Sequence, residues 1–226
     1  MTDTRWKVET HSHTRYSKDS LTTAEAFIHA CRRRRINRAI VTDHNTAAGG
    51  LALARLAPDL IIVGEEIMTT AGEILAFFVQ ETVPPFLSPA ETISRLRDQG
   101  AFISVSHPFD RLRKGAWTEA DLLAIVDQVD AIETFNARCL FAGDNARAQA
   151  FANAHGIPGT AGSDAHIPFE LGRATLRMTP FDGPESFAEA LRTAMPEVHL
   201  SPFWVHGSST IAKWLRKLGL SRMPAT

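Results

Sequence analysis

The segment that decides the fold lies near the start of the chain and reads Lys7-Val8-Glu9-Thr10-His11-Ser12-His13. Residues 7–10 are expected to form a strand, and His11 and His13 follow it directly. Side chains two residues apart on an extended chain point to the same side. The two imidazoles could therefore share one divalent ion, although a single pair at this spacing is weak evidence, because surface histidines often show it.

Short apolar strands alternate with helical stretches along most of the 226 residues. The expected strands are 7–10, 39–42, 60–63, 74–79, 101–105, 131–134 and 157–161. The expected helices are 23–35, 47–56, 89–99, 119–128 and 144–154. This alternation predicts a parallel sheet in an α/β fold, and seven strands in one domain favour a closed or nearly closed barrel.

The chain changes character at about residue 178, beyond which it is broken up by Pro180, Pro184, Pro196 and Pro202. A last helix is expected at 210–218. One of its sides carries Ile211, Trp214, Leu215 and Leu218, and the other carries Lys213, Arg216 and Lys217. This pattern predicts a packing helix with a solvated basic side rather than a membrane-surface helix. We expect one domain over residues 1–226, with a core at about 7–178 and a C-terminal extension at 179–226.

Composition narrows the possible functions. The net charge is −1, from 24 basic and 25 acidic residues, so no broad basic field is available to hold a nucleic-acid duplex. The arginine run 32–35 is interpreted as a solvated helix end. No apolar run approaches the roughly 18–20 residues of a membrane span, and Met1–Thr4 shows no signal-peptide character. Two widely spaced cysteines are interpreted as reduced thiols, so a cytoplasmic enzyme is expected.

Residues suited to catalysis collect directly after the expected strands. In chain order they are His11 and His13, Asp43 and His44, Glu65 and Glu66, His107, Glu133 and Asn136, and Asp164 and His166. In an α/β barrel the carboxyl ends of the strands share one rim, where active sites lie. The pair Asp164 and His166 repeats the spacing of the first histidine pair, and Gly162 permits a tight exit from the last strand. These residues are therefore expected to meet.

The candidate ligands offer nitrogen and carboxylate oxygen without thiolate, which favours manganese, zinc or iron. They also outnumber the roughly three protein ligands of one catalytic ion, so a cluster of two or three ions is expected. Such clusters activate water and stabilise the leaving oxygen of a phosphate ester.

The ordered motifs resemble the PHP family, named for polymerase and histidinol phosphatase domains. The matching segments span residues 7–175 and are His11-Ser12-His13-Thr14 with Ser17 and Asp19, Thr42-Asp43-His44-Asn45-Thr46, Gly64-Glu65-Glu66-Ile67, Ser106-His107-Pro108-Phe109, Ile132-Glu133-Thr134-Phe135-Asn136 and Gly162-Ser163-Asp164-Ala165-His166. The resemblance implies a distorted (β/α)7 TIM-like barrel. It also implies a multinuclear metal centre that hydrolyses phosphate esters.

When the family's ligands are matched to positions of this chain, the resemblance implies three sets of metal ligands. His11, His13, Glu66 and Asp164 would hold one ion. Glu66 would bridge to a second ion held by His107, with the neighbouring Glu65 as the rival bridge. Asp19, His44 and His166 would hold a third.

One departure from the family pattern concerns the second ion. Many members place a histidine shortly after the Gly-x-Glu strand, whereas this chain has no histidine between His44 and His107. Glu73 could replace it as an oxygen ligand, which would shift the preference toward manganese or iron. The sequence therefore leaves open whether the centre holds two ions or three.

Further roles follow from position. A metal-bridging hydroxide is expected to attack phosphorus, with Asp43, Glu133 and Arg138 as candidate catalytic residues. The planar guanidinium of arginine suits phosphate, so Arg15, Arg113 and Arg138 are candidate substrate ligands. Asn136 is a further candidate for substrate binding. The expected substrate is a small-molecule phosphate ester or a nucleotide. The chain carries no large inserted cap domain, which predicts a fairly open site.

Two other functions remain as alternatives. Amidohydrolases also place an HxH pair after the first barrel strand, but they are expected to supply a bridging lysine. This chain has no lysine between Lys18 and Lys114, and its late Asp164 is paired with His166. The other alternative is a non-catalytic metal or nucleotide sensor, against which the nearly complete set of ligands argues.

Overall fold

The computed structural model describes residues 4–224, so Met1–Asp3, on which part of the signal-peptide expectation depends, lie outside it. It is a mixed α/β structure built on one nine-stranded sheet in the order β7-β6-β5-β4-β3-β2-β1-β8-β9. The strands are β1 (Trp6–Glu9), β2 (Arg38–Val41), β3 (Ile61–Met68), β4 (Glu73–Phe77), β5 (Phe102–Val105), β6 (Ala131–Asn136), β7 (Gly159–Gly162), β8 (Ala174–Met178) and β9 (Met195–Val198).

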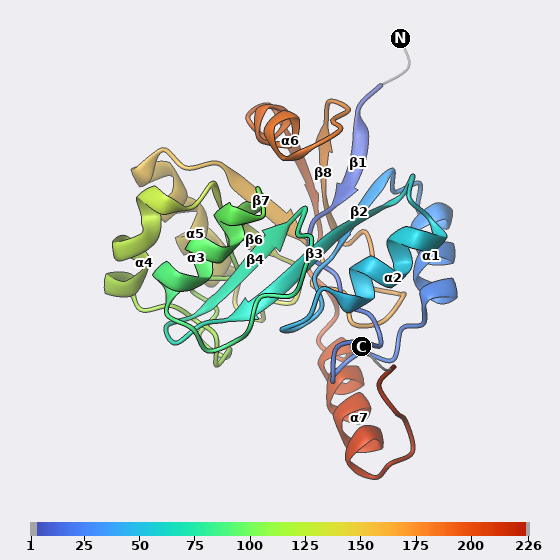
Figure 1. The fold of residues 1–226 in the computed structure, drawn as a ribbon. Coiled ribbons are helices and arrows are strands. Elements are labelled where there is room, and N and C mark those ends of the chain that lie inside the picture. Colours follow the sequence, from blue (N-terminus) through green and yellow to red (C-terminus); the bar gives the residue numbers. More distant parts are fainter. Residues whose placement is uncertain (1–3, 225–226) are drawn as a thin grey trace.

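The first five helices flank the sheet, and the last two lie at its opposite ends (Figure 1). The helices are α1 (Ala24–Arg33), α2 (Ala48–Leu56), α3 (Pro89–Asp98), α4 (Glu119–Ile125) with the 3-10 turn η1 (Val126–Gln128), α5 (Ala142–His155), α6 (Pro184–Leu191) and α7 (Val205–Lys217). Several begin and end as the sequence predicts. The Ser88 hydroxyl caps α3 by accepting from the Glu91 amide, and Gly156 ends α5 in the left-handed conformation, with φ 65°. None of the helices in the described part of the chain is long and apolar enough to cross a membrane.

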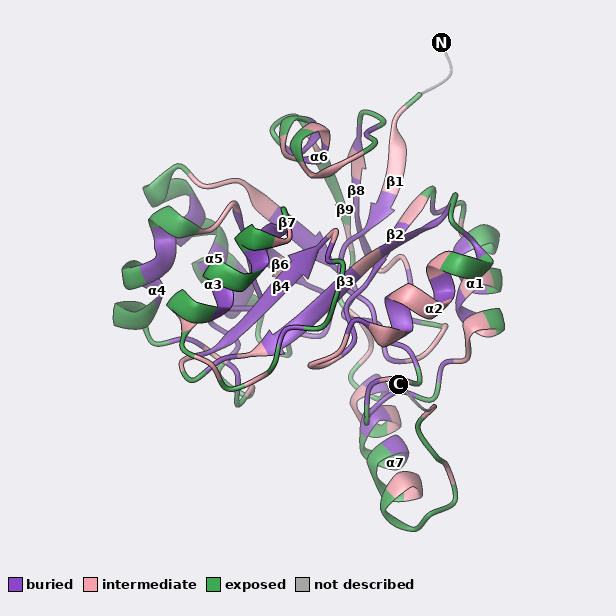
Figure 2. Cartoon of the chain, viewed as in Figure 1, coloured by how far each residue is buried: buried purple, intermediate pink, exposed green. Residues whose placement is uncertain are grey.

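The sheet curls until its ends nearly meet, which confirms the predicted barrel-like fold. The segment after β7 reaches β1 through a parallel bridge between Ser12 and Ala165, where the His13 amide donates to the Ala165 carbonyl at 2.8 Å. Most of the strands are buried, and the helices expose one side to solvent, as Figure 2 shows. The outer strand β9 is the exception, since most of its residues are exposed.

The sheet is mixed and not purely parallel as expected, because two of its strands, β4 and β8, run antiparallel to their neighbours. β4 runs antiparallel to both β3 and β5. The turn between β3 and β4 holds only residues 69–72, and so short a connection joins antiparallel strands, whereas a parallel pair needs a crossover. Pairing with β4 also extends β3, so that Glu65 and Glu66 lie within the strand instead of following it. Glu133 and Asn136 likewise lie within β6.

Aromatic side chains close the barrel end at which the parallel strands begin. Phe77 ends the reversed strand β4 and Phe102 begins β5, so both lie at that end. Phe187 of α6 packs against them, with ring centroids 5.7 Å from Phe77 and 4.9 Å from Phe102. In Figure 1 α6 lies at this upper end and α7 at the opposite, lower end.

The proline-rich tail is more ordered than the sequence suggests. β8 pairs antiparallel with β1, and β9 pairs with β8 as an outer strand. Pro196 fits there because an edge strand tolerates a residue without an amide hydrogen. The alternation of strand and helix does not predict these elements, since prolines interrupt the pattern.

Candidate metal centre

The candidate ligands meet at the end of the barrel where the parallel strands end. His11 and His13 follow β1, His44 follows β2, His107 follows β5, and Asp164 and His166 follow β7. Glu66 comes from within β3, and Glu73 begins β4. Because β4 is reversed, its first residue lies at the rim where its neighbours end. The reversal therefore brings Glu73 to the histidines.

Four donor atoms form the tightest group. The Nε2 atoms of His11 and His13 are 3.1 Å apart, and Oε2 of Glu66 lies 3.4 Å from each. Oδ1 of Asp164 lies 3.6 Å from the His11 nitrogen and 3.2 Å from the His13 nitrogen. Ligands about 2.1 Å from a tetrahedral ion are about 3.4 Å apart, so this group has the dimensions of a site for one ion.

The carboxylate of Glu66 faces two groups of donors at once. Its Oε1 lies 3.0 Å from His107 Nε2, and its Oε2 lies 3.0 Å from His44 Nδ1. Glu73 stands on the same side, 3.6 Å from His107 Nε2 and 3.8 Å from His44 Nδ1. The neighbouring Glu65 points away, and its Oε2 accepts from the Val83 amide at 2.9 Å. Glu66, and not Glu65, therefore lies between the two groups of donors, since side chains alternate along a strand.

A third group surrounds Asp19. Its two carboxylate oxygens lie 3.5 Å from His44 Nε2 and 3.5 Å from His166 Nε2. His13, His44 and His166 also bring one nitrogen each within 4.8 Å of the others. His44 faces Glu66 through one nitrogen and Asp19 through the other, so its ring is shared between the second and third groups.

Buried polar atoms in these groups lack protein partners. Oδ1 of Asp19, Oε2 of Glu66 and Oδ1 of Asp164 accept no hydrogen bond from the described residues, although all three atoms are buried. An unpaired buried carboxylate oxygen is costly, whereas a bound cation would satisfy it. The mixture of imidazole nitrogen and carboxylate oxygen suits manganese, zinc or iron. The residues present therefore fit a cluster of divalent ions.

Burial and neighbouring charges shift the pKa values of the candidate ligands in different directions. Burial lowers the pKa of His13 well below its usual range, and the neighbouring His166 and His44 lower it further. Burial would do the same to His11, but the carboxylates of Glu66, Glu133 and Asp164 raise its pKa well above the ordinary value. Burial would raise the pKa of Glu66, but His11 and His44 hold it well below its usual range.

Two candidate ligands have unusual backbone conformations. The φ angle is 21° at His107 and 51° at Asp164, in the region that normally favours glycine. Each such residue costs about 1–3 kcal/mol and persists only where its surroundings hold it. At His107 the amide donates to Glu133 Oε2 at 2.9 Å.

Glu133 and Asn136, candidates for catalysis and substrate binding, lie behind the ligands. Glu133 Oε1 lies 2.9 Å from His11 Nδ1, the nitrogen that does not face the ligand group. Asn136 Nδ2 donates to Glu133 Oε2 at 3.1 Å and to Asp164 Oδ2 at 3.3 Å. This arrangement resembles the carboxylates that orient metal-binding histidines, and it favours an orienting role.

Asp43, the other acid predicted to act in catalysis, holds the loop after β1. It accepts from the amide of Thr14 at 2.7 Å and from the hydroxyls of Thr14 and Ser17. The Ser17 hydroxyl also lies 3.2 Å from His13 Nδ1 and accepts from the His44 amide at 3.0 Å. Asp43 is thus linked to two candidate ligands through one serine that sequence reasoning assigned no role.

The three predicted arginines lie in different surroundings. Arg113 pairs with Asp164 at the cluster and with Asp110, whose Oδ2 is 3.4 Å from its Nε. Arg138 is buried, with its Nε 3.2 Å from Glu170 Oε1. Arg15 is exposed, and its guanidinium donates to the Arg222 carbonyl at 3.5 Å. Of the three, only Arg113 contacts a candidate ligand.

A cavity of about 260 Å³ lies beside the third group of ligands. Its walls include Asp19, His166 and Arg113 from the barrel, and His206, Ser209 and Lys213 from α7. The prediction of a fairly open site did not include the wall that α7 forms here. Sequence reasoning missed the α7 residues, since only the docking of that helix brings them near the ligands.

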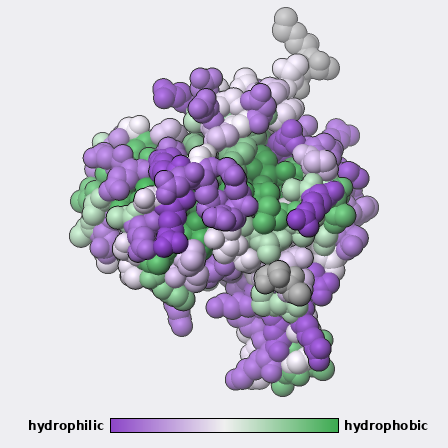
Figure 3. All heavy atoms as spheres, in the orientation of Figure 1, coloured by the Kyte–Doolittle hydropathy of each residue, from purple (hydrophilic) through white to green (hydrophobic). Residues whose placement is uncertain are grey.

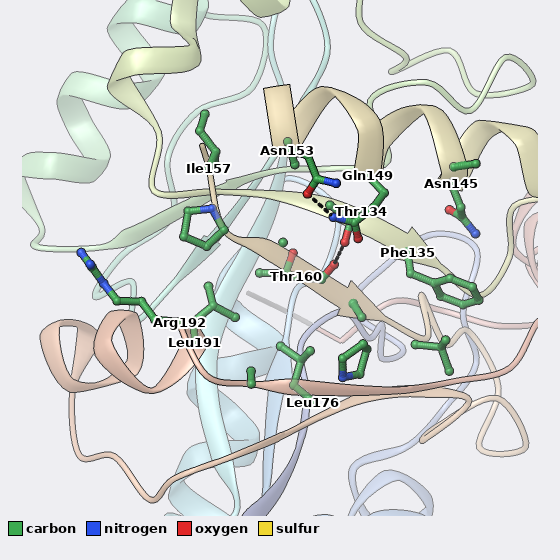
Figure 4. Close-up of a pocket in the computed structure, with 18 of the residues that line it drawn as sticks. Thr134, Phe135, Asn145, Gln149, Asn153, Ile157, Thr160, Leu176, Leu191 and Arg192 are labelled. Carbon is green, nitrogen blue, oxygen red and sulfur yellow. Dashed lines mark hydrogen bonds between the residues drawn. The ribbon is translucent and has the colours of Figure 1, made fainter. Parts of the chain in front are cut away.

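A larger cavity of about 1110 Å³ lies elsewhere, on the outside of the barrel between α5 and the segment from α6 to β9. Figure 4 shows its lining, with Gln149 and Asn153 on one wall and Leu176, Leu191 and Arg192 opposite. None of its lining residues is a candidate ligand. The candidate functional site is therefore the cluster of histidines and carboxylates, and not this larger cavity.

Two sequence comparisons relate the chain to known proteins. The family model described as PHP-associated matches residues 142–195. The uncharacterized protein MJ0417 of Methanocaldococcus jannaschii is 31% identical over 202 residues, which cover 85% of this chain and 81% of that protein.

Solved structures share the fold at low sequence identity. A two-domain protein of Bacteroides vulgatus, described as containing a predicted PHP-like metal-dependent phosphoesterase, superposes with a TM-score of 0.70 at 19% identity. The match covers 87% of this chain and 65% of that one. A protein of Chromobacterium violaceum described as an amidohydrolase has a TM-score of 0.59 at 13% identity, with 91% and 96% of the two chains covered.

Fold and site together define an α/β barrel of the PHP type, whose rim gathers histidines and carboxylates suited to metal ions. The chain belongs to the PHP family.

Proposed function

We propose that the chain is a metal-dependent phosphoesterase that hydrolyses phosphate esters. The observation that carries the proposal is the group of His11, His13, Glu66 and Asp164, whose facing atoms lie 3.1–3.6 Å apart. Glu66 would bridge this group to a second one with His107 and Glu73, and Asp19, His44 and His166 would form a third. Two or three ions of manganese, zinc or iron would occupy these sites.

Bound divalent ions would supply positive charge for the phosphate oxygens and would lower the pKa of a water molecule. The protein would supply orientation. Glu133 would hold the His11 ring in place, and Arg113 would present its guanidinium to a phosphate oxygen beside Asp164. Burial of the groups would strengthen each of these interactions, because little water screens them.

The proposed substrate is a small-molecule phosphate ester or a nucleotide. A net charge of −1 argues against stable binding of duplex nucleic acid. Cys31 and Cys139 are both free and buried, as is usual for proteins of a reducing compartment such as the cytoplasm.

The amidohydrolase alternative has support from the fold of the Chromobacterium violaceum protein. Amidohydrolases are expected to use a lysine as the bridging ligand. The proposed bridge here is Glu66, and no lysine occurs between Lys18 and Lys114, which argues against this alternative. A non-catalytic sensor is disfavoured by the number of ligand atoms that converge.

A substrate screen tests the proposed function. The full chain is depleted of metal, reloaded with manganese, and assayed for phosphate release from nucleotide and sugar esters, in parallel with turnover of cyclic amides. We expect phosphate release that a chelator abolishes. His11→Ala should remove the activity, whereas His29→Ala, an exposed histidine of α1, serves as the matched control and should retain it. Turnover of the amides alone, or activity surviving in His11→Ala, would reject the proposal.

A further inference from the structure

The last helix docks on the barrel in the opposite orientation to the one its sequence predicts. Its apolar residues Ile211 and Trp214 are each 60% exposed. Val205, Ser209 and Ala212 are buried, and Lys213 and Arg216 reach the barrel from the same side. The predicted packing side therefore faces solvent, because the rim offers carbonyl and carboxylate oxygens that attract the basic side. Figure 3 shows hydrophobic groups at the lower end of the protrusion that α7 forms.

Two arginines hold α7 against the rim. Near its start, the guanidinium of Arg138 donates to the Val205 carbonyl at 3.1 Å and to the Ser209 hydroxyl at 3.0 Å. Near its end, Nη2 of Arg216 donates to three carbonyls of the loop after β1, those of Arg15, Ser17 and Ser20, at 2.7–3.1 Å. The helix is thus fixed near its start to the segment after β6, and near its end to the loop that follows His11 and His13.

This docking places an ammonium group at the cluster. Nζ of Lys213 lies 3.2 Å from Asp19 Oδ2, while its side chain remains 53% exposed. It lines the cavity of about 260 Å³ together with Arg113 and His206. The other cation of this wall, Arg138, is buried and directs its guanidinium to Glu170, Val205 and Ser209. Arg113 and Lys213 are also ion-paired, with Asp164 and Asp19, but 22% and 53% of their side chains remain exposed. Lys213 and Arg113 are therefore the charged donors of the cavity that a ligand could engage.

We infer that Lys213 is a phosphate-binding residue of the substrate cavity, and that α7 makes the site selective for phosphate monoesters over diesters. The inference rests on the proposed function. A terminal phosphate carries up to two negative charges and three free oxygens, which matches donors on two walls of the cavity. A diester carries one charge and needs room for a chain on each side. The volume is below the range of about 300–1,000 Å³ typical of ligand pockets, so it suits a phosphate group with part of one leaving group.

An ion at Asp19 would strengthen this role. The ammonium group and a divalent cation would compete for the same carboxylate oxygen, and like charges repel. A phosphate oxygen between them would relieve the repulsion. Lys213 would then bind substrate in the metal-loaded protein more strongly than it binds Asp19.

Phosphate binding and ester kinetics test the inference in the full chain. Inorganic phosphate is titrated calorimetrically into the manganese-loaded wild type, Lys213→Met, Lys213→Arg and Lys217→Met. KM and kcat are measured with p-nitrophenyl phosphate and with its bis-ester. In Lys213→Met we expect Kd for phosphate and KM for the monoester to rise about tenfold, as for a lost charged hydrogen bond, with a smaller change for the diester. Lys213→Arg should recover most of the loss, and Lys217→Met, an exposed lysine on the same helix, should behave as wild type.

The outcomes separate the inference from the proposed function. Unchanged phosphate affinity in Lys213→Met would overturn the inference, even if the wild type hydrolyses esters. Equal rises in KM for monoester and diester would overturn the claim of selectivity. A loss of bound metal or of melting temperature shared by the Met and Arg variants, with phosphate affinity per loaded site unchanged, would assign Lys213 a structural role instead. If the wild type hydrolyses nothing but binds phosphate through Lys213, the proposed function and the claim of selectivity fail, and only the phosphate-binding role of Lys213 stands.

Discussion

Glu133 contacts one imidazole nitrogen of His11 while the other nitrogen faces the ligand group. A carboxylate in this position fixes the tautomer of the ring and raises its basicity. Its second oxygen accepts from the His107 amide and the Asn136 amide group, so one side chain orders three parts of the rim.

Replacing Glu133 by Gln should weaken metal binding without removing a ligand. The amide keeps the shape but loses the charge, and removal of such partners typically costs about 10–100-fold in metal affinity or activity. Competition with a chromogenic chelator measures the affinity, with the exposed Glu91→Gln as control. An affinity equal to that of the wild type would show that Glu133 does not act through His11.

Glu73 offers a second test at the scale of one residue. It lies within 3.8 Å of both His107 and His44, where it would supply an oxygen ligand. Glu73→His should shift the relative affinity of the second ion from manganese toward zinc, since imidazole suits zinc better than carboxylate does. Metal content after equilibration in a mixture of the two ions measures the shift. An unchanged ratio would place Glu73 outside the ligand set.

At the scale of the element, the anchoring of α7 can be separated from the stability of the barrel. Arg216→Ala removes three hydrogen bonds to the loop after β1. We expect faster amide hydrogen exchange across residues 205–217 and unchanged exchange in β1 to β7, because the sheet is held by its own ladder. Lys217→Ala, on the exposed side of the helix, should leave exchange in the anchoring segment as in wild type. Equal protection of α7 in both variants would contradict the anchoring role.

The elements also show which parts of the molecule the sequence could predict. The pairs His11/His13 and Asp164/His166 were found because their spacing is local and each follows a strand. The position of Glu73 depends on the reversal of β4, which is set by a short turn that the alternation of strand and helix does not reveal. Lys213 is nearly 200 residues from Asp19 in the sequence, and only the docking of α7 brings the two together. The amphipathic pattern of this helix predicts that its other face packs against the barrel.

At the scale of the whole molecule, bound metal should contribute to stability. The cluster concentrates buried carboxylates whose oxygens lack protein donors, so cations should bind the folded state and not the unfolded one. A ligand at 100 times its Kd stabilises a protein by about 2.7 kcal/mol per site. Urea unfolding with manganese and with chelator should show an increase of this order. His11→Ala should lose much of the increment, and equal stability under both conditions would count against a metal cluster.

The two thiols should report on the integrity of the fold. Burial raises the pKa of Cys31, and burial together with nearby Asp110 and Glu133 raises that of Cys139. Thiolate is the reactive form, so both residues should resist iodoacetamide at pH 8 until the protein unfolds. Mass spectrometry after timed labelling checks this. Rapid labelling of the native protein would mean that one of these regions opens readily.

The aromatic side chains of Phe77, Phe102 and Phe187 close one end of the barrel, and this closure affects how product leaves the site. With the far end of the barrel closed, molecules reach the cluster only from the rim, and the product must leave by the route through which the next substrate arrives. Released phosphate would then occupy the entrance that the ester needs. Turnover should slow as product accumulates, and the ester should overcome this inhibition when its own concentration is raised.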